Sequence, residues 1–378
     1  MFRRPRRSTV ALAAAIAVAL SLVSAPALAK KKRVSTTKAL PDSAPDAVSY
    51  GQRDDVMRFG AELAERRGLD TDWVLSSLAQ ARMLPSVARL VMPPPAGTAK
   101  NWAAYRARFI EPRRIAAGLA FWNDNEAWLR LAEERYGVPP EIVVGIVGVE
   151  TLYGQQMGNF RTIDALATLA FDFPSGRRDR SAFFRDELEA YLALCRDQGV
   201  DPLAWRGSYA GAIGMPQFMP SSIAAHAVDF DGDGRIDLHA STADVIGSVA
   251  SFLARAGWQR GLPTHFELDV PVDTGERAAL LEPDILPLFS PQEFVEHGAR
   301  LPDEAMALES SKLALVELQN GDAPPGYVAG TTNFYAITRY NWSSYYAMAV
   351  IGLGEAVRRQ RPPAPPAPPV TAEPAGTP

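Results

Sequence analysis

The sequence Pro139-Pro-Glu-Ile-Val-Val-Gly-Ile-Val-Gly-Val-Glu150 decides the fold of this chain. Proline is well tolerated at the first position of a helix, so Pro140 marks a helix start. The residues that follow are apolar on nearly every face, which is typical of a helix buried on all sides. Gly145 and Gly148 lower helix propensity, and the usual compensation is close approach by another backbone. We therefore expect a buried helix that ends near Glu150.

The carboxyl group of Glu150 stands at the end of this apolar helix. Desolvation disfavours the charged carboxylate, and the C-terminal pole of a helix disfavours it further. Both effects raise the pKa of Glu150 toward the value that a general acid needs near neutral pH. The alternative interpretation is a Glu that merely emerges into solvent.

The flanking sequence is helical before this segment and mixed after it. Asp70 and Thr71 are plausible caps for a helix through Trp73 to Met83. Alternating apolar residues after Thr264 predict short strands. The expected fold class is α+β, predominantly α-helical, with a small β part late in the chain. The remaining expected elements are a helix opening at Asp55, a helix over Ile115–Tyr136, strands near Phe266–Val270, Leu313–Glu317 and Phe334–Tyr340, and a final helix over Ser343–Arg359.

The charge of the chain argues against nucleic-acid binding. Of the 378 residues 22% are charged and the formal net charge is −4. Residues 1–29 contain four arginines and no acid, so the rest carries 35 basic and 43 acidic residues and a net charge of −8. Phosphate binding requires clustered Lys and Arg, so we expect no nucleic-acid partner.

The N-terminus has the pattern of an export signal. Arginines at 3–7 precede an apolar run over Val10–Val23, and Ala27-Leu28-Ala29 is a small-x-small cleavage site, so residues 1–29 are predicted to be a signal peptide. An uncleaved anchor is the less favoured alternative. The single cysteine, Cys195, lies far from that site and reads as buried packing. We therefore expect a soluble periplasmic protein with no disulfide, no lipid and no membrane anchor after cleavage.

The two ends of the mature chain differ in composition from its centre. Residues 30–46 are basic and then Ser/Thr/Pro-rich, which predicts a flexible linker. Residues 359–378 are predicted to form a Pro-rich disordered tail. The folded catalytic region should therefore span residues 47–358.

Several blocks in order resemble the lytic murein transglycosylase B family. The central one is Gly148-Val-Glu-Thr-Leu-Tyr-Gly154, and the resemblance runs from about residue 50 to 358. The other blocks are Tyr105–Ile110, Pro139–Gly145, Asp164–Phe171, Gly207–Ser222, Ala227–Phe230 with Gly232-Asp-Gly234, Ile337–Asn341 and Tyr346–Val350. The resemblance implies a lysozyme-like catalytic core with an additional helical subdomain.

The same resemblance implies the reaction and its residues. The enzyme would cleave the β-1,4 bond between N-acetylmuramic acid and N-acetylglucosamine in peptidoglycan strands and form 1,6-anhydromuramyl ends. Glu150 would act as acid and then as base, without a catalytic cofactor. The implied substrate-binding residues are Tyr105, Ser208, Gln217, Tyr340, Asn341 and Tyr346. For Tyr105, ordinary helix packing is a serious alternative.

Two other functions compete with this one. A hydrolytic muramidase would use the same Glu150 and add water, and a non-catalytic glycan-binding protein would need no buried acid. A second carboxylate would favour hydrolysis, but the obvious candidate, Asp164, reads better as a helix cap. The Pro-rich tail reads as a disordered end, with docking of a partner as the alternative, and we name no protein partner.

The acidic loop over residues 229–244 resembles the start of an EF-hand. Its spaced carboxylates suit a hard cation, and its sixth residue is glycine. The twelfth position holds Ala240 in place of the usual Glu, so the loop is atypical. The alternative is a solvated Asp/Gly turn. The resembled family has such an atypical EF-hand-like site, and the resemblance implies a structural Ca²⁺ ion whose ligands come from Asp229, Asp231, Asp233, Arg235 and Asp244.

Overall fold

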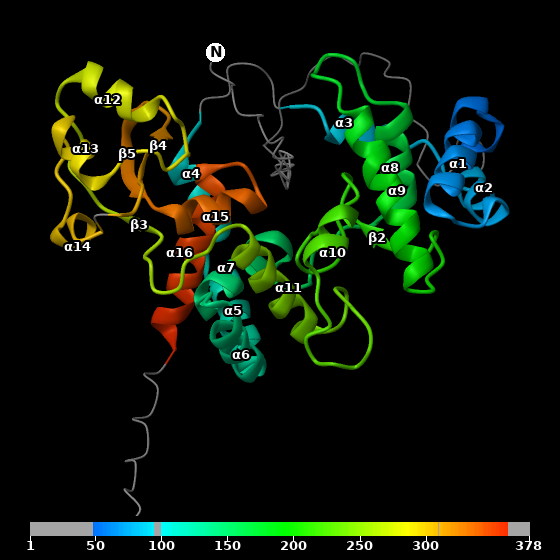
Figure 1. The fold of residues 1–378 in the computed structure, drawn as a ribbon, viewed down its shortest axis with the longest axis horizontal. Helices are drawn as coiled ribbons and strands as arrows, with labels where there is room; N and C mark the ends of the chain where they lie inside the picture. The colour runs from blue at the N-terminus through cyan, green and yellow to red at the C-terminus, as the bar shows by residue number, and fades with distance from the viewer. Residues whose placement is uncertain (1–47, 94–99, 309, 362–378) are drawn as a thin grey trace, which may run out of the picture.

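The computed structural model describes residues 48–93, 100–308 and 310–361 (Figure 1). The predicted signal peptide and linker, and the tail beyond residue 361, lie outside the described residues. The helices are η1 (Tyr50–Gln52), α1 (Asp54–Arg67), α2 (Thr71–Ala79), α3 (Pro85–Leu90), α4 (Trp102–Phe109), α5 (Pro112–Asp124), α6 (Glu126–Tyr136), α7 (Pro140–Thr151), α8 (Thr162–Phe171), α9 (Ser181–Asp197), α10 (Pro220–His226), α11 (Thr242–Arg255), α12 (Thr274–Leu281), α13 (Pro291–Glu296), α14 (Asp303–Met306), α15 (Thr332–Tyr340) and α16 (Ser344–Gln360). The strands are β1 (Phe160–Arg161), β2 (Arg206–Gly207), β3 (His265–Phe266), β4 (Ala314–Asn320) and β5 (Ala323–Gly330).

Helix α7 lies in the middle of the molecule and packs along α16 (Figure 1). All ten of its residues from Ile142 to Thr151 are buried, as its apolar pattern predicted. A Cβ atom on Gly145 would stand 2.2 Å from the carbonyl oxygen of Val350 in α16. The expected close approach of another backbone is confirmed at Gly145, whereas at Gly148 the close neighbours are the side chains of Tyr153 and Leu353.

The N-terminal helices α1 and α2 pack against each other at one end of the molecule (Figure 1). Asp70 caps α2, because its side chain accepts the backbone N–H of Trp73 at 2.7 Å. The predicted extension of this helix to Met83 is wrong, since α2 ends at Ala79. Arg82 instead pairs with Ser49 in an isolated β-bridge.

The helix predicted over Ile115–Tyr136 is in fact two helices, α5 and α6, broken at Asn125. The amide nitrogen of Asn125 donates to the carbonyl of Phe121 at 2.8 Å, and its oxygen accepts the hydroxyl of Thr242. Short polar side chains compete in this way with the regular helix bonds. The contact with Thr242 joins the break to the start of α11.

The late β part is an antiparallel sheet in the order β3-β5-β4, and helices α12–α14 lie beside it (Figure 1). Leu315 and Ala329 face a second hydrophobic core that includes Phe294. The strand predicted near Leu313–Glu317 is confirmed as β4. The strand suggested over Phe334–Tyr340 is wrong, because these residues form α15, whose start is capped by the Thr331 hydroxyl at the N–H of Asn333.

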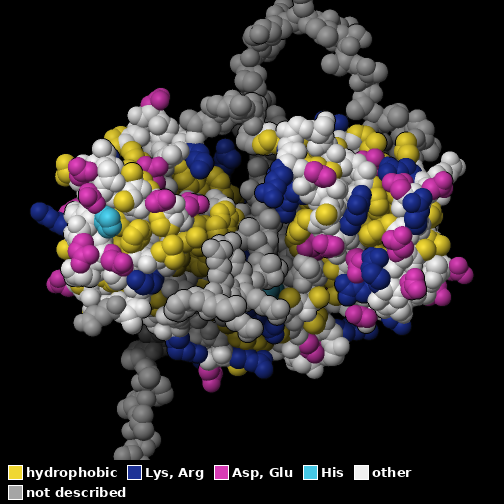
Figure 2. All heavy atoms as spheres, turned by 45° about the horizontal axis from the view of Figure 1, so that its top comes forward, with side chains coloured by type: hydrophobic (Ala, Val, Ile, Leu, Met, Phe, Trp, Pro, Cys, Tyr) yellow, Lys and Arg dark blue, Asp and Glu magenta, His cyan; other side chains and the backbone are white. Residues whose placement is uncertain are grey.

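The expected fold class, predominantly helical with small sheets, is confirmed. Cys195 is buried in the main core, as expected. Within residues 48–93, 100–308 and 310–361, no helix is both long and apolar enough to cross a membrane. With the top of the molecule tilted forward, hydrophobic side chains gather on the side of the left half that faces the right half (Figure 2).

Candidate active site

Glu150 occupies the last turn of α7, beside the first turn of α16. Its residue surface is only 8% exposed, so the carboxyl group is removed from bulk water and does not simply emerge into solvent. The hydroxyl of Tyr346 donates a hydrogen bond to Oε1 of Glu150 at 2.6 Å. The two residues are 196 positions apart in the sequence, and the packing of α16 along α7 brings them together.

Burial raises the pKa of Glu150 to about 7, and the hydrogen bond from Tyr346 opposes this rise. Desolvation favours the neutral acid, whereas a donated hydrogen bond favours the carboxylate. A carboxyl group balanced in this way exchanges its proton near neutral pH. It can therefore give a proton in one step and take one back in the next.

Three tyrosines feel the charge of this carboxyl group, and we call Tyr105, Tyr340 and Tyr346 the tyrosine cluster. Desolvation raises the pKa of each phenol, and the charge of Glu150 raises it further. The rings of Tyr340 and Tyr346 stack with centroids 6.3 Å apart. All three hydroxyls therefore stay protonated and remain hydrogen-bond donors.

Tyr105 belongs to an aromatic group on α4. Its ring lies 6.4 Å from that of Trp102, 5.1 Å from that of Phe109 and 5.7 Å from that of Tyr345, measured between centroids. Tyr105 therefore does pack among other aromatic residues, as the alternative interpretation held. The charge of Glu150 nevertheless raises its pKa, so it also lies within electrostatic reach of the acid. Asn341, next to Tyr340 in the chain, is buried and directly follows α15.

Two of the predicted substrate-binding residues, Ser208 and Gln217, make hydrogen bonds to the backbone in and around the loop over residues 207–222. The Ser208 hydroxyl oxygen accepts the N–H groups of Ala210 and Ala212 at 3.3 and 3.1 Å. The Gln217 amide nitrogen donates to the carbonyls of Met157 and Gly214 at 3.1 and 2.9 Å. These bonds fix both side chains, while the Ser208 proton and the Gln217 amide oxygen are not used by them.

The loop is joined to the acid by contacts that sequence reasoning missed. The Thr151 hydroxyl donates to the carbonyl of Met215 at 2.9 Å, and the Tyr340 hydroxyl donates to that of Pro216. Arg114 donates to the carbonyl of Gly148 and so satisfies the C-terminal end of α7. No local pattern signals these bonds, because their partners lie 34 to 124 residues apart.

The backbone beside Glu150 is strained. Leu152 and Tyr153 both have positive φ, 50° and 56°, and Gln217 has a φ of 52°. Each such residue costs about 1–3 kcal/mol, and such strain gathers where the surrounding structure holds a functional geometry. The turn that follows Glu150 is a C-terminal helix cap, closed by hydrogen bonds from the N–H groups of Leu152 and Tyr153 to the carbonyls of Gly148 and Val147.

Asp164 is not a helix cap as predicted but the third residue of α8. Its carboxylate forms an ion pair with Arg161 at 2.7 Å and accepts the backbone N–H of Arg82 at 3.0 Å. It is thus fully engaged elsewhere. Among the described residues, no second carboxylate contributes to the pKa of Glu150.

Three carboxylates of the acidic loop come together. One oxygen each from Asp229, Asp231 and Asp244 lies within 4.8 Å of the others, and Asp244 is 1% exposed. The negative charges of Asp231 and Asp229 add to burial in raising the pKa of Asp244. Asp233 is outside this group and accepts the N–H of Arg235 at 2.8 Å. Oxygen donors in this arrangement fit a hard cation such as Ca²⁺.

Comparisons with known proteins identify the family of this chain. The family model of the transglycosylase SLT domain matches residues 51–355. Membrane-bound lytic murein transglycosylase B of Escherichia coli (strain K12) is 39% identical over 320 residues, which cover 82% of this chain and 85% of that protein. A lytic transglycosylase of Escherichia coli in complex with calcium superposes with a TM-score of 0.71 at 37% identity, over 83% of this chain and 96% of that one. SltB3 from Pseudomonas aeruginosa in complex with NAG-anhNAM-pentapeptide superposes with a TM-score of 0.67 at 30% identity, over 82% of this chain and 80% of that one. The chain therefore belongs to the transglycosylase SLT domain family and is an enzyme, a lytic transglycosylase of peptidoglycan.

Proposed function

We propose that Glu150 is the single catalytic acid and base of this enzyme, and that it cleaves the β-1,4 bond between N-acetylmuramic acid and N-acetylglucosamine. The observation that carries the proposal is one buried carboxyl group with a pKa of about 7 and no carboxylate partner among the described residues. Two-carboxylate glycosidases need a second acid for water or for a covalent intermediate, whereas substrate-assisted enzymes do not.

The first step breaks the glycosidic bond. Protonated Glu150 gives its proton to the bridging oxygen, so N-acetylglucosamine leaves with a free hydroxyl group. The bonding electrons depart with that oxygen, and the acetamido group of the muramyl residue stabilises the cationic carbon. Burial favours the protonated acid before this step, as the raised pKa of Glu150 requires.

The second step closes the anhydro ring. The Glu150 carboxylate takes the proton from the C6 hydroxyl, whose oxygen bonds to the anomeric carbon and displaces the acetamido oxygen. The Tyr346 hydroxyl stabilises the carboxylate between the two steps through its 2.6 Å hydrogen bond. The acid is thereby regenerated, and no water enters the products.

The residues around Glu150 are proposed to hold the glycan. The Ser208 hydroxyl and the Gln217 amide oxygen suit sugar hydroxyl and acetamido groups. Tyr105 adds a ring face and a protonated phenol, Tyr340 adds a ring face while its hydroxyl donates to the carbonyl of Pro216, and Asn341 adds an amide beside Tyr340. These roles follow from their closeness to Glu150 or to the loop that contacts it.

Glu150→Gln tests the acid directly. Loss of a general acid costs about 10²–10⁴-fold in rate, so this variant should show no clearing in a peptidoglycan zymogram while it still binds glycan. Glu141→Gln, at the other end of α7, is the matched control and should keep its activity. Near-normal turnover by the Glu150 variant would refute the assignment.

Mass spectrometry of the products tests the second step. Muropeptides released by the wild-type enzyme should end in 1,6-anhydromuramic acid. Ordinary reducing ends would instead mean that water attacks, as in a hydrolytic muramidase. In that case Glu150 would remain the acid and only the ring closure would be withdrawn.

A structural calcium ion is proposed at the acidic loop. Asp229, Asp231 and Asp244 would hold it, and the ion would offset their mutual repulsion. Asp244 also accepts the N–H groups of Phe230 and Asp237, at 2.8 and 2.7 Å, and so ties the loop to α11. The ion would stabilise this part of the fold and take no part in the reaction.

Export to the periplasm is the last part of the proposal. It rests on the arginine-rich start, the apolar run and the Ala27-Leu28-Ala29 site, all within residues outside the described part of the chain. N-terminal sequencing of the mature protein from a periplasmic extract should begin at Lys30. An intact N-terminus recovered from the membrane fraction would contradict cleavage.

A further inference from the structure

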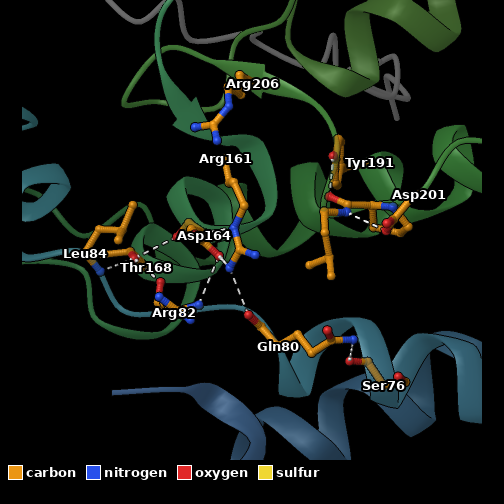
Figure 3. Close-up of polar contacts among 12 residues, drawn as sticks. Ser76, Gln80, Arg82, Leu84, Arg161, Asp164, Thr168, Tyr191, Asp201 and Arg206 are labelled. Carbon is orange, nitrogen blue, oxygen red and sulfur yellow. Dashed lines mark hydrogen bonds and ion pairs between the residues drawn. The ribbon is translucent and has the colours of Figure 1, made fainter. Parts of the chain in front are cut away.

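A pocket apart from the surroundings of Glu150 lies between the segment after α2 and the two-stranded sheet of β1 and β2. It is a cavity of about 490 Å³ with Leu84 and Phe160 as apolar lining and Arg82, Arg161 and Arg206 as basic lining. We call it the arginine pocket. Figure 3 shows Arg161 extending from its strand toward Asp164 and the carbonyl of Gln80, with Arg206 close by.

Two of these arginines face each other across the sheet. Arg161 and Arg206 are direct partners in the antiparallel pairing of β1 with β2. Side chains so paired have Cβ atoms about 5 Å apart on one face, and like charges in this position destabilise a sheet. The arrangement therefore carries a cost that an anion between the two guanidinium groups would remove.

The one carboxylate that lines the pocket, Asp164, balances only one of its three arginines. Asp164 is already paired with Arg161 through two hydrogen bonds of 2.7 Å. The guanidinium of Arg206 donates one hydrogen bond of 2.8 Å to the carbonyl of Asn159, and its other N–H groups have no partner in the described part of the chain. The guanidinium of Arg82 likewise has no hydrogen-bond or ion-pair partner among the described residues. Two positive charges, on the half-buried Arg82 and the exposed Arg206, thus remain beside an apolar wall formed by Leu84 and Phe160.

The pocket adjoins the catalytic loop. Asn159 comes two residues after Met157, whose carbonyl accepts the Gln217 amide, and Arg206 comes two residues before Ser208. Two residues span at most about 7 Å. An extended peptide of five residues spans up to about 17 Å, so a peptide attached to a sugar bound near Gln217 has the length to reach the pocket.

We propose that the arginine pocket binds a carboxylate of the peptide stem carried by the muramic acid of the substrate. The inference rests on the proposed glycan site, because that site places the stem. Arg82 and Arg206 supply the free donors, and Arg161, the strand partner of Arg206, is held in place by Asp164. The enzyme would thereby favour strands that carry peptides over naked glycan. The same donors would also accept a free inorganic anion, which the experiment separates.

The experiment measures binding of a muramyl tripeptide with free carboxylates and of its fully amidated counterpart, by calorimetry. Arg82→Gln and Arg206→Gln should each weaken binding of the free acid about tenfold, or about 1.4 kcal/mol, and the double variant should weaken it further. The amidated peptide should bind weakly to every variant. Arg58→Gln with Arg130→Gln, two exposed arginines outside the pocket, is the matched control for net charge and should leave binding unchanged.

Three outcomes would overturn the proposal. The first is equal affinity for the free and amidated peptides, and the second is normal binding by the Arg82/Arg206 double variant. The third is binding of inorganic phosphate that the muramyl tripeptide cannot displace, which would make the pocket a site for a free anion. The muramyl tripeptide has no glycosidic bond to break, so these results do not depend on whether Glu150 is the catalytic acid. Cleavage of naked glycan should be the same in the double variant as in the wild type.

Discussion

Replacing Glu150 by Gln should stabilise the fold at neutral and alkaline pH, although it removes activity. Burial raises the pKa of this carboxyl group from 4.5 to about 7. Between these two pH values the folded state keeps a proton that the unfolded state loses, so the stability of the wild type falls as pH rises through this window. The Gln side chain has nearly the same shape, can still accept the Tyr346 hydroxyl and carries no charge to desolvate.

The magnitude follows from the size of the window. At about 1.4 kcal/mol for each pH unit, the burial of Glu150 costs about 3 kcal/mol above pH 7 and nothing below pH 4.5. The Glu150→Gln variant should therefore match the wild type at about pH 4 and exceed its free energy of unfolding by about 3 kcal/mol at about pH 8. At about pH 6 the gain should be intermediate.

Urea unfolding followed by circular dichroism at these three pH values measures the difference. Glu65→Gln, on an exposed position of α1, removes one negative charge from the surface and should change stability by no more than about 0.5 kcal/mol at any pH. A gain in the Glu150 variant that is the same at acid and alkaline pH would refute the desolvation argument. So would a loss of stability at about pH 8.

Three further predictions concern the same structure. Tyr346→Phe removes the hydroxyl that stabilises the Glu150 carboxylate, so the pKa of Glu150 should rise and the alkaline limb of the pH–rate profile should move to higher pH. An alkaline limb that stays in place would show that this hydrogen bond does not tune the acid. Gly145→Ala would place a methyl group 2.2 Å from the Val350 carbonyl oxygen and should lower the free energy of unfolding, measured in urea, by about 1–3 kcal/mol. Gly352→Ala, whose methyl group meets only the flexible end of Ile110, should lower it less. Equal losses of stability would argue against backbone contact as the cause. Calcium should raise the melting temperature relative to chelator, and Asp231→Asn should reduce that rise; if calcium changes nothing, the metal site is withdrawn.

Much of the centre of the fold could be predicted from the sequence. The segment Pro140–Thr151 is apolar on every side, and burial all round is the only stable place for such a helix. The same pattern predicts the close packing at Gly145 and the direction of the pKa shift of Glu150, because both follow from the burial of the helix. The Asp70 cap and strand β4 were predicted for a similar reason, since their signals span only a few neighbouring residues.

The helix boundaries that were wrong depend on distant partners. The break at Asn125 is fixed by a hydrogen bond to Thr242, which lies 117 residues away. Residues Phe334–Tyr340 alternate enough to suggest a strand, but the Thr331 cap and burial of Phe334 and Ile337 on one side make them a helix. A periodic pattern read over seven residues cannot record either contact.

The sequence by itself determined that the chain has a buried helix with an acid at its end, and the ordered blocks around it pointed to the family. Only the tertiary structure decided what surrounds that acid. The Tyr346 hydrogen bond spans 196 residues, and the ring of Tyr153, just after the acid, packs against that of Phe121 in α5 with centroids 5.2 Å apart. The facing of Arg161 and Arg206 likewise depends on a pairing of strands only two residues long. The physical reason is that burial is encoded by composition along a helix, whereas the geometry of polar groups is set by which elements pack together.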